Sequence, residues 1–447
     1  MTLTPKQQKQ LRRPRPFLFL LLMALFGLPW VLLFRNGVRS RHQQAEMTVL
    51  SEAFFAQFET YPRNDSAKQF DQLGASLGFI PNDSRDLTYQ IDAEADRAYR
   101  AIEAPLGQFL EAQIALSADS LAPLPPSLAS YLSTVRPQLN RLQAHLLNGD
   151  RPQWEVDIER MSDQVYPFPG LSNTLNVQKL LLLSAVDYHQ HHQHSKMVAA
   201  LEASWQLNQA VSLRPDLTSQ VSASVVSAYQ AGLLRRLDDV PLQWQARLAQ
   251  QAEQQSVMRG LEFDVWLQYQ TLQKSLAQVI IRSSRFEASA SGEPIKNLAY
   301  WFSPVYYFNL TNIDTAQTAQ RALDRLNALS VCATSQAEAE AMLATEETAR
   351  WNEAIAPVPS VLARRWRVAG DRAIALELTQ KVLEAKQQAP ATGQWPKSLA
   401  NTTSTICPQE RWIYKLADDN TITISLSTAV VPAPLVPISY QSKAPEN

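Results

Sequence analysis

An uninterrupted apolar stretch near the N-terminus, Phe17–Phe34, constrains this chain more than any other feature of its sequence. It contains eighteen residues and no charge. A helix rises ~1.5 Å per residue, so roughly 17–25 apolar residues are needed to cross a hydrocarbon core of about 30 Å. Gly27 and Pro29 would weaken a helix in water but are tolerated in a bilayer. Trp30 and Phe34 lie toward one end, where aromatic side chains favour the membrane interface. The stretch is therefore predicted to be a transmembrane helix in the lipid bilayer.

A cleaved signal peptide and a buried core helix are the two alternatives for this stretch. A signal peptide would be followed by a pair of small residues at a cleavage site, but the chain continues with Arg35-Asn36-Gly37. A core helix would not be expected to follow a cationic leader. The sequence therefore favours an uncleaved, single-pass anchor.

The basic residues around the anchor indicate its orientation. Five of them precede it and three follow it: Lys6, Lys9, Arg12, Arg13 and Arg15, then Arg35, Arg39 and Arg41. Because basic residues accumulate on the cytoplasmic side, the N-terminus is predicted to be cytoplasmic. No later stretch resembles a second span, so the rest of the chain is predicted to be an extracytoplasmic body.

Composition indicates an α-rich body and gives no reason to expect nucleic acid as a partner. The chain has 41 basic and 42 acidic residues, and such a balance does not attract polyanions. Only 12 of the 447 residues are glycine, while Ala, Leu and Gln, which favour helices, are abundant. The basic run Arg364–Arg367 is interpreted as a solvated helix face, with Trp366 on the apolar side.

Hydrophobic periodicity and helix-breaking residues divide the chain into consecutive segments. Pro126 is predicted to begin one helix and Asp216 to cap another. Leu242–Gln255 and Val361–Lys386 are predicted helices, the second with a clear apolar stripe. The predicted segments are a basic cytoplasmic tail (1–16), the anchor (17–34), a stalk and linker (35–86), a helical-hairpin array of irregular period (87–288), an aromatic segment with helices (289–360), a long helix with a β-hairpin (361–427) and a disordered tail (428–447).

The sequence contains none of the motifs that would identify an enzyme or a cofactor site. Its closest glycines are Gly74 and Gly78, which excludes the G-x-G-x-x-G and P-loop patterns that bind phosphates. It has no G-x-S-x-G, no H-E-x-x-H and no C-x-x-C. We therefore predict no cofactor, no catalytic residue and no enzymatic activity.

One histidine cluster is a weak candidate for a metal site. Four of the six histidines, His189, His191, His192 and His194, lie close together. On a helix, residues three or four apart share a face and could ligate zinc or copper. The flanking glutamines and Lys196 instead favour a solvated helix end.

Two further features are candidates for a partner surface and a disulfide. Six aromatic residues form the possible partner surface: Tyr300, Trp301, Phe302, Tyr306, Tyr307 and Phe308. Tyr and Trp are common at interfaces, although a hydrophobic wedge between helices is the more ordinary reading. The two cysteines, Cys332 and Cys407, are compatible with one disulfide in an oxidising compartment.

The C-terminal region resembles a known group of proteins. The helix Arg364–Gln388, the turn Gly393-Gln394-Trp395-Pro396-Lys397-Ser398-Leu399 and the strands around Trp412 and Tyr414 are similar to the helix, G-x-[YW]-P-x-S-L turn and β-hairpin of pseudopilin-like C-terminal regions. The order of parts resembles uncharacterised bacterial envelope proteins with a membrane anchor and a helical array. Pseudopilins have a glutamate five residues after a cleaved glycine, whereas Leu32 stands five residues after Gly27, so this chain is not expected to be processed as a pilin.

These observations favour a membrane-anchored protein of the bacterial inner membrane, with its bulk in the periplasm, that acts as a non-enzymatic scaffold for other envelope proteins. An accessory of a secretion or pilus-like system is the alternative that the resemblance implies. A metal-dependent enzyme built on His189–His194 is a second alternative.

Overall fold

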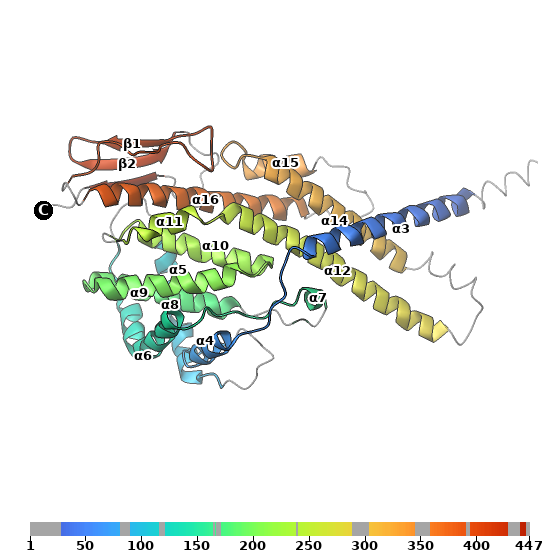
Figure 1. Cartoon of the computed structure of the whole chain (residues 1–447), viewed down its shortest axis with the longest axis horizontal. Helices are drawn as coiled ribbons and strands as arrows, with labels where there is room; N and C mark the ends of the chain where they lie inside the picture. The colour runs from blue at the N-terminus through green and yellow to red at the C-terminus, as the bar shows by residue number, and fades with distance from the viewer. Residues whose placement is uncertain are drawn as a thin grey trace, which may run out of the picture. The chain divides into compact units, whose positions relative to one another are not determined.

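The computed structural model describes residues 28–80, 90–115, 121–163, 166, 171–237, 240–287, 304–344, 358–389, 394–427 and 439–443. This part of the chain is mainly helical, as predicted, with one small antiparallel sheet (Figure 1). It divides into two compact units. The first unit comprises residues 1–57 and 269–316, and the second comprises residues 58–268 and 317–447. One boundary, between residues 57 and 58, follows a helix that ends at Phe55, and the other two fall within the long helices α12 (Glu253–Glu287) and α14 (Pro304–Ala328).

In the first unit, three helices are joined by hydrogen bonds between side-chain amides. These helices are α3 (Leu28–Phe55), the later part of α12 and the beginning of α14. Gln44 donates to Gln273 at 2.9 Å, Gln273 donates to Asn309 at 2.7 Å, and Asn309 donates back to Gln44 at 3.0 Å. One amide from each helix thus closes a three-membered ring. Because each amide both donates and accepts, the ring fixes which positions of the three helices lie opposite one another.

The predicted membrane anchor lies mostly outside the described residues. Only Leu28–Phe34 belongs to them, as the beginning of α3. None of the helices in the described ranges is both long enough and apolar enough to cross a membrane.

The second unit contains the remaining helices, and several predicted boundaries are confirmed. The helices are α4 (Asp65–Ala75), α5 (Ala93–Ala115), α6 (Pro126–Asn148), α7 (Ile158–Met161), α8 (Leu171–Gln190), α9 (His194–Ser212), α10 (Leu217–Leu234), α11 (Gln243–Ala249), α15 (Gln336–Ala344) and α16 (Val358–Gln388). Pro126 is the first residue of α6, and Asp216 caps α10 by accepting from the backbone N–H of Ser219 at 2.9 Å.

Helix α4 corrects the predicted linker over residues 35–86. The polar and glycine residues that favoured a loop prove to be the ends of a helix. Asn64 is the N-cap, because its side chain accepts from the backbone N–H of Ala67 at 2.8 Å. Gly78, with φ of +86°, follows the helix. Between these ends, Phe70 is buried and its ring packs edge-on against Trp154.

Helices α8, α9 and α10 pack side by side and are joined by buried polar side chains as well as apolar ones. Gln178 of α8 donates to the backbone carbonyl of Ser204 in α9, and the hydroxyl of Ser204 donates back to Gln178 at 2.6 Å. Gln230 of α10 donates to the same hydroxyl at 2.9 Å. All three residues are buried, so the centre of the array depends on matched hydrogen bonds.

Helix α16 lies between two hydrophobic clusters. Leu376 and Leu383 belong to the cluster that α4–α11 form, whereas Leu362 and Trp366 belong to the cluster formed with α14, α15 and the sheet. The apolar stripe that was predicted for this helix therefore packs against two hydrophobic clusters. Arg367 is also buried, where it pairs with Asp371 at 2.9 Å and donates to the carbonyl of Val331. Its prediction as a solvated residue is wrong, because the guanidinium pairs with a buried carboxylate and donates to backbone carbonyls.

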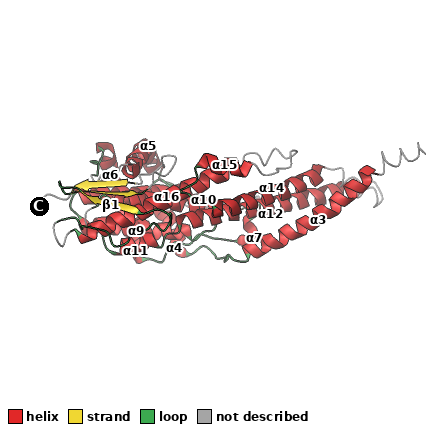
Figure 2. Cartoon of the chain, turned by 90° about the horizontal axis from the view of Figure 1, so that it is seen from above, coloured by secondary structure: helices red, strands yellow, loops and turns green. Residues whose placement is uncertain are grey.

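The sheet has three strands where a two-stranded hairpin was predicted. β1 (Trp412–Leu416) and β2 (Thr421–Leu426) form the expected hairpin, with Tyr414 opposite Ile424. β3 (Ser439–Lys443) pairs antiparallel with β2, in the order β1-β2-β3. The prediction of a disordered tail is wrong for this strand, because Tyr440 is buried in the same cluster as Trp412. Figure 2 shows the sheet beside α16, which both β2 and β3 contact.

A disulfide and a buried carboxylate hold the loop between α16 and the sheet. Cys332 and Cys407 form a disulfide, with their Cα atoms 5.9 Å apart. Glu377 of α16 accepts from the hydroxyl of Ser404 and from the backbone N–H of Thr405, both at 2.6 Å. The loop is thus fixed to α16 by charge-assisted hydrogen bonds.

Candidate functional site

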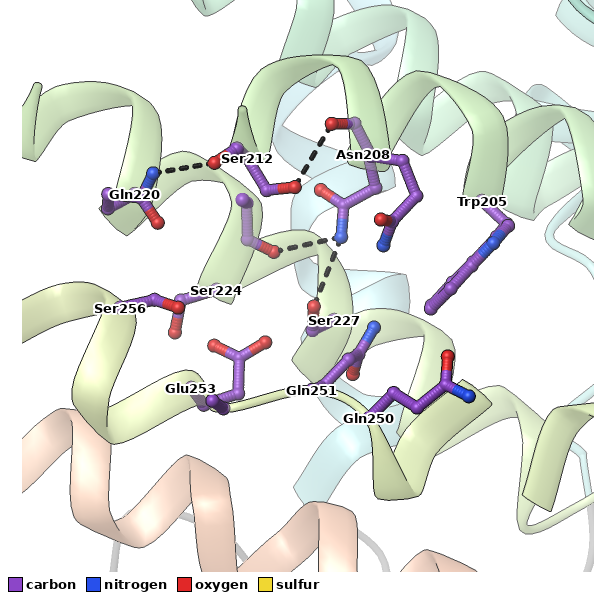
Figure 3. A pocket seen from close by; sticks show the side chains of 13 residues that line it. Trp205, Asn208, Ser212, Gln220, Ser224, Ser227, Gln250, Gln251, Glu253 and Ser256 are labelled. Atoms are coloured by element: carbon purple, nitrogen blue, oxygen red, sulfur yellow. Dashed lines mark hydrogen bonds between the residues drawn. The ribbon is translucent and has the colours of Figure 1, made fainter. Parts of the chain in front are cut away.

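A polar cavity in the second unit is a candidate site in the described part of the chain. It has a volume of about 240 Å³ and lies between the end of α9, the first half of α10 and the α11–α12 junction (Figure 3). Ten of its lining residues are labelled in the figure: Trp205, Asn208, Ser212, Gln220, Ser224, Ser227, Gln250, Gln251, Glu253 and Ser256. Such a concave site with converging polar groups is the usual setting for a small ligand.

The cavity exists because the chain breaks where the sequence predicted one helix. Leu242–Gln255 was expected to be continuous, but α11 ends at Ala249 and α12 begins at Glu253. The break places Gln250 and Gln251 beside α9 and α10. On the opposite side, the side-chain amide of Gln220 donates to the carbonyls of Ser212 and Arg214 and so holds the turn between α9 and α10.

Glu253 places a buried carboxylate in this cavity. It is the residue at the start of α12, and only 8% of its surface is exposed. Burial raises the pKa of Glu253, while hydrogen bonds from Ser227 and Ser224 and the charge of Arg372 lower it to a smaller extent. Figure 3 shows the carboxylate directed toward the side of the cavity where these serines lie. A carboxyl group with a perturbed pKa in a cavity is a recognised indicator of function.

The two serines link Glu253 to an amide on one side and a guanidinium on the other. Ser227 accepts from the side-chain Nδ2 of Asn208 at 3.1 Å, and Ser224 accepts from Arg372 of α16 at 3.0 Å. Each hydroxyl therefore accepts one hydrogen bond, and both lie where they lower the pKa of Glu253. This arrangement orients the carboxylate through groups from three helices.

Two amide oxygens at the cavity have no hydrogen-bond partner in the described structure. They are Oδ1 of Asn208 and Oε1 of Gln251. Asn208 is 2% exposed, and its Nδ2 also donates to the carbonyl of Ala223 at 3.2 Å, which fixes which end of the amide is the acceptor. Buried polar atoms are normally paired, so these two oxygens are exceptions among the residues that line the cavity.

Trp205 supplies the aromatic wall of the cavity. Its ring packs edge-on against Trp244, and the guanidinium of Arg247 lies over both rings, 5.3 Å and 5.2 Å from their centroids. Arg247 also pairs with Glu202, at 3.0 Å from its Nη2 to Oε1. The guanidinium of Arg247 thus contacts both indole rings and a carboxylate, and these contacts hold Trp205 in place.

The polar lining of the cavity is suited to hydrogen bonding with a ligand. Its polar side chains are amides, hydroxyls, one carboxylate and one indole, and two alanines complete the lining. The two serines that contact the carboxylate are engaged as described above, and no histidine or cysteine lines the cavity. The arrangement offers hydrogen-bond acceptors in a largely desolvated space.

The histidine cluster lies at the junction of α8 and α9, which agrees with the predicted helix end. His189 is in the last turn of α8, His194 is the first residue of α9, and His192 adopts a left-handed conformation with φ of 55°. His191 is 63% exposed, and its Nδ1 lies 2.8 Å from the carbonyl of Asp187. Within the described ranges, no three His, Cys, Asp or Glu side chains are grouped so that they could hold a metal ion.

The aromatic candidate surface falls largely outside the described residues. Tyr300, Trp301 and Phe302 precede α14, and Tyr306–Phe308 belong to its first turns, where only the backbone is described. The predicted partner surface therefore stays a prediction.

The residues of the cavity were not identified from the sequence. Ser224, Ser227 and Asn208 occur on helices whose polar positions resemble solvated faces, and the pairing of Glu253 with α10 depends on the missed break. Buried serines and amides on two successive helices that are otherwise strongly apolar were the one available signal.

The chain was also compared with known proteins. No protein-family model, no curated protein and no solved structure matches it.

Proposed function

We propose that this protein is a membrane-anchored scaffold of the bacterial cell envelope, with its body outside the cytoplasm and without enzymatic activity. The disulfide between Cys332 and Cys407 is the observation that carries the proposal. Disulfides persist in oxidising compartments and are rare in the cytosol. Cys407 is 1% exposed, which is typical of a structural bond. The apolar stretch Phe17–Phe34 supplies the anchor in this proposal.

The helical array supports the scaffold part of the proposal. Neighbouring helices in such an array bury a shared core and leave an extended outer surface for partners. The core extends from Phe70 in α4 to Leu248 in α11. Large apolar side chains also remain on the surface of the second unit, among them Leu213 at 59% and Leu242 at 71% exposure. Other envelope proteins are the proposed partners.

Labelling of the cysteines in intact cells tests the compartment. A maleimide that reaches the periplasm but does not cross the inner membrane should label Cys332 and Cys407 only after reduction under denaturing conditions. A reporter cysteine in the N-terminal tail, Gln8→Cys in a Cys332→Ser/Cys407→Ser background, should label only after lysis. If the native cysteines label without reductant and only after lysis, the body is cytoplasmic and the proposal fails.

Crosslinking tests the interaction. Crosslinked membranes should yield at least one envelope protein in stoichiometric amount with the tagged chain. A parallel purification from cells expressing a chain without residues 17–34 controls for binding that does not depend on the anchor. Recovery of the tagged chain alone would contradict a scaffold role.

An accessory role in a secretion or pilus-like system is the second candidate. It is favoured by the way the predicted turn packs. The hydroxyl of Tyr414 in β1 donates to the carbonyl of Pro396 at 2.6 Å, and Trp395 is buried in the same cluster as Trp412. The helix, turn and strands thus form one packed module, as the resemblance to pseudopilin-like regions implies. Unchanged secretion and piliation in a deletion strain would exclude this role.

A further inference from the structure

We propose that the cavity between α9, α10 and the α11–α12 junction binds a small, uncharged polyhydroxyl molecule of about the size of one sugar residue. The proposal concerns a binding site in the body and does not depend on the scaffold role.

The free hydrogen-bonding groups of the cavity indicate what such a molecule must supply. Three acceptors belong to residues that line the space: the carboxylate of Glu253, Oδ1 of Asn208 and Oε1 of Gln251, the last two buried and without partners in the described structure. No buried donor among the lining residues is left without a partner. Because unpaired buried acceptors are unfavourable, the matching ligand carries several O–H or N–H donors.

The cavity mouth favours hydroxyl groups as those donors. Gln209 is half-buried and Gln250 is exposed at the cavity, and each side-chain amide both donates and accepts. A hydroxyl also does both, so one ligand hydroxyl can donate inward to an acceptor such as Glu253 while it accepts from an amide at the mouth. An ammonium group has no acceptor to offer.

The charges around the cavity favour a neutral ligand. The carboxylate of Glu253 interacts with the guanidinium of Arg372, which donates to Ser224 at 3.0 Å. Arg247, beside Trp205, is paired with Glu202. Within each pair, the negative charge of the carboxylate and the positive charge of the guanidinium compensate each other. A charged ligand would therefore enter a partly desolvated space without an unpaired counter-ion, which is unfavourable.

The size and the wall of the cavity are consistent with a single sugar residue. The volume of about 240 Å³ lies just below the roughly 300–1,000 Å³ that drug-sized ligands occupy. Trp205 offers a rigid apolar surface next to the polar groups, and an indole beside hydrogen-bonding groups suits a molecule with both apolar C–H and polar O–H faces.

The full chain can be tested directly by saturation-transfer NMR and calorimetry. It should be prepared in nanodiscs or in a polyoxyethylene detergent, because maltoside and glucoside detergents carry sugar head groups. D-Glucose, N-acetyl-D-glucosamine and myo-inositol are the neutral probes, and putrescine and inorganic phosphate are the charged comparators. At least one neutral probe should bind saturably, and neither charged molecule should.

Two phenylalanine variants locate the binding. Ser256→Phe places a large side chain in the cavity, whereas Gln255→Phe makes the same change at the adjacent, exposed position of α12, which does not line the cavity. Binding should be lost in the first variant and kept in the second, with both shown to be folded by circular dichroism. Glu253→Gln should weaken binding about tenfold, the loss expected for one charge-assisted hydrogen bond.

Three results would overturn the proposal. One is the absence of saturable binding by all three neutral probes. Another is saturable binding of putrescine or phosphate in their place, which would mean a charged ligand class. The third is undiminished sugar binding by Ser256→Phe. If Ser256→Phe does not fold, Gln251→Leu in the α11–α12 junction replaces it, and undiminished binding by that variant has the same consequence.

Discussion

Gln44 and Gln273, 229 positions apart in the chain, share a hydrogen bond of 2.9 Å between their side-chain amides. Asn309 completes the ring by accepting from Gln273 and donating to Gln44. Asn309 is buried and the two glutamines are half-buried. Each amide thus satisfies two others, and loss of any one leaves a donor and an acceptor without partners.

Gln273→Leu should destabilise the first unit by about 1–2 kcal/mol, because an unpaired donor on Gln44 and an unpaired acceptor on Asn309 remain. Native-state hydrogen exchange of the amides around Gln44 in α3 measures this locally. Gln268→Leu removes an exposed hydrogen bond to Asp264 on the same helix, outside the first unit, and should change protection around Gln44 by no more than a few tenths of a kcal/mol. Equal effects of the two variants would mean that the ring adds nothing.

Gly370→Ala should destabilise the second unit, whereas Gly107→Ala should stabilise it. A Cβ at Gly370 of α16 would lie 2.4 Å from Cγ1 of Val331, but a Cβ at Gly107 of α5 would meet nothing within 4 Å. Overpacking of this kind costs about 1–3 kcal/mol, while alanine in place of a helical glycine gains about 0.5–1 kcal/mol. Denaturant unfolding of both variants gives the comparison. Stabilisation by both would show that the loop at Val331 moves freely.

The carboxyl group of Glu253 should make stability fall as pH rises. Burial raises its folded-state pKa above the ordinary value of 4.5, so between the two pKa values the folded chain keeps a proton that the unfolded chain has lost. Stability therefore declines through that range. Glu253→Gln removes the titration. The advantage of the variant over the wild type in free energy of unfolding should therefore grow from about pH 4.5 upward and then level off. Denaturant unfolding across this range tests the sign, and an advantage that is independent of pH would contradict it.

Removal of the disulfide should cost about 2–4 kcal/mol, because the bond between Cys332 and Cys407 spans 75 positions and restricts the unfolded chain. The measurement is thermal unfolding of the wild type with and without reductant. Reductant should lower the transition temperature of the wild type and leave Cys332→Ser/Cys407→Ser unchanged. A reductant effect of equal size in the double variant would exclude the disulfide as its cause.

Two arginines in the apolar stretch should release the chain from membranes. Leu22→Arg with Leu25→Arg introduces charges near the middle of the predicted span, each unfavourable by about 2.5–3.5 kcal/mol in a bilayer centre. The variant should appear in the soluble fraction after carbonate extraction. Leu11→Arg, outside the stretch, serves as the control. Full retention of the double variant in the membrane would refute the predicted anchor.

Local signals in the sequence were sufficient for most of the helices. Proline at the start of α6 and aspartate before α10 act within a few residues, and both predictions are confirmed. The same kind of signal misled at Asn64 and Gly78, because the residues that end a helix are also those that favour loops. The apolar periodicity of α16 was evident, but periodicity does not reveal that Leu376 and Trp366 face different clusters.

The features that were missed depend on contacts between distant segments. β3 has little local strand signal and is stabilised by pairing with β2 and by burial of Tyr440. The cavity likewise needs Asn208, Ser227 and Glu253 to meet from three elements. A serine on a helix has the same sequence signature whether it faces water or a buried carboxylate, so only the packed structure distinguishes the two.

The disulfide has a topological consequence for the second unit. Cys332 follows α14 and Cys407 precedes β1, so the bond closes a covalent ring that includes α15 and α16. A single backbone cut anywhere inside that ring leaves one molecule, since its two pieces stay linked through sulfur. A protease that nicks the protein there would separate the sheet from the helical array only after the bond is reduced. The second unit therefore has two independent covalent routes from its helices to its sheet.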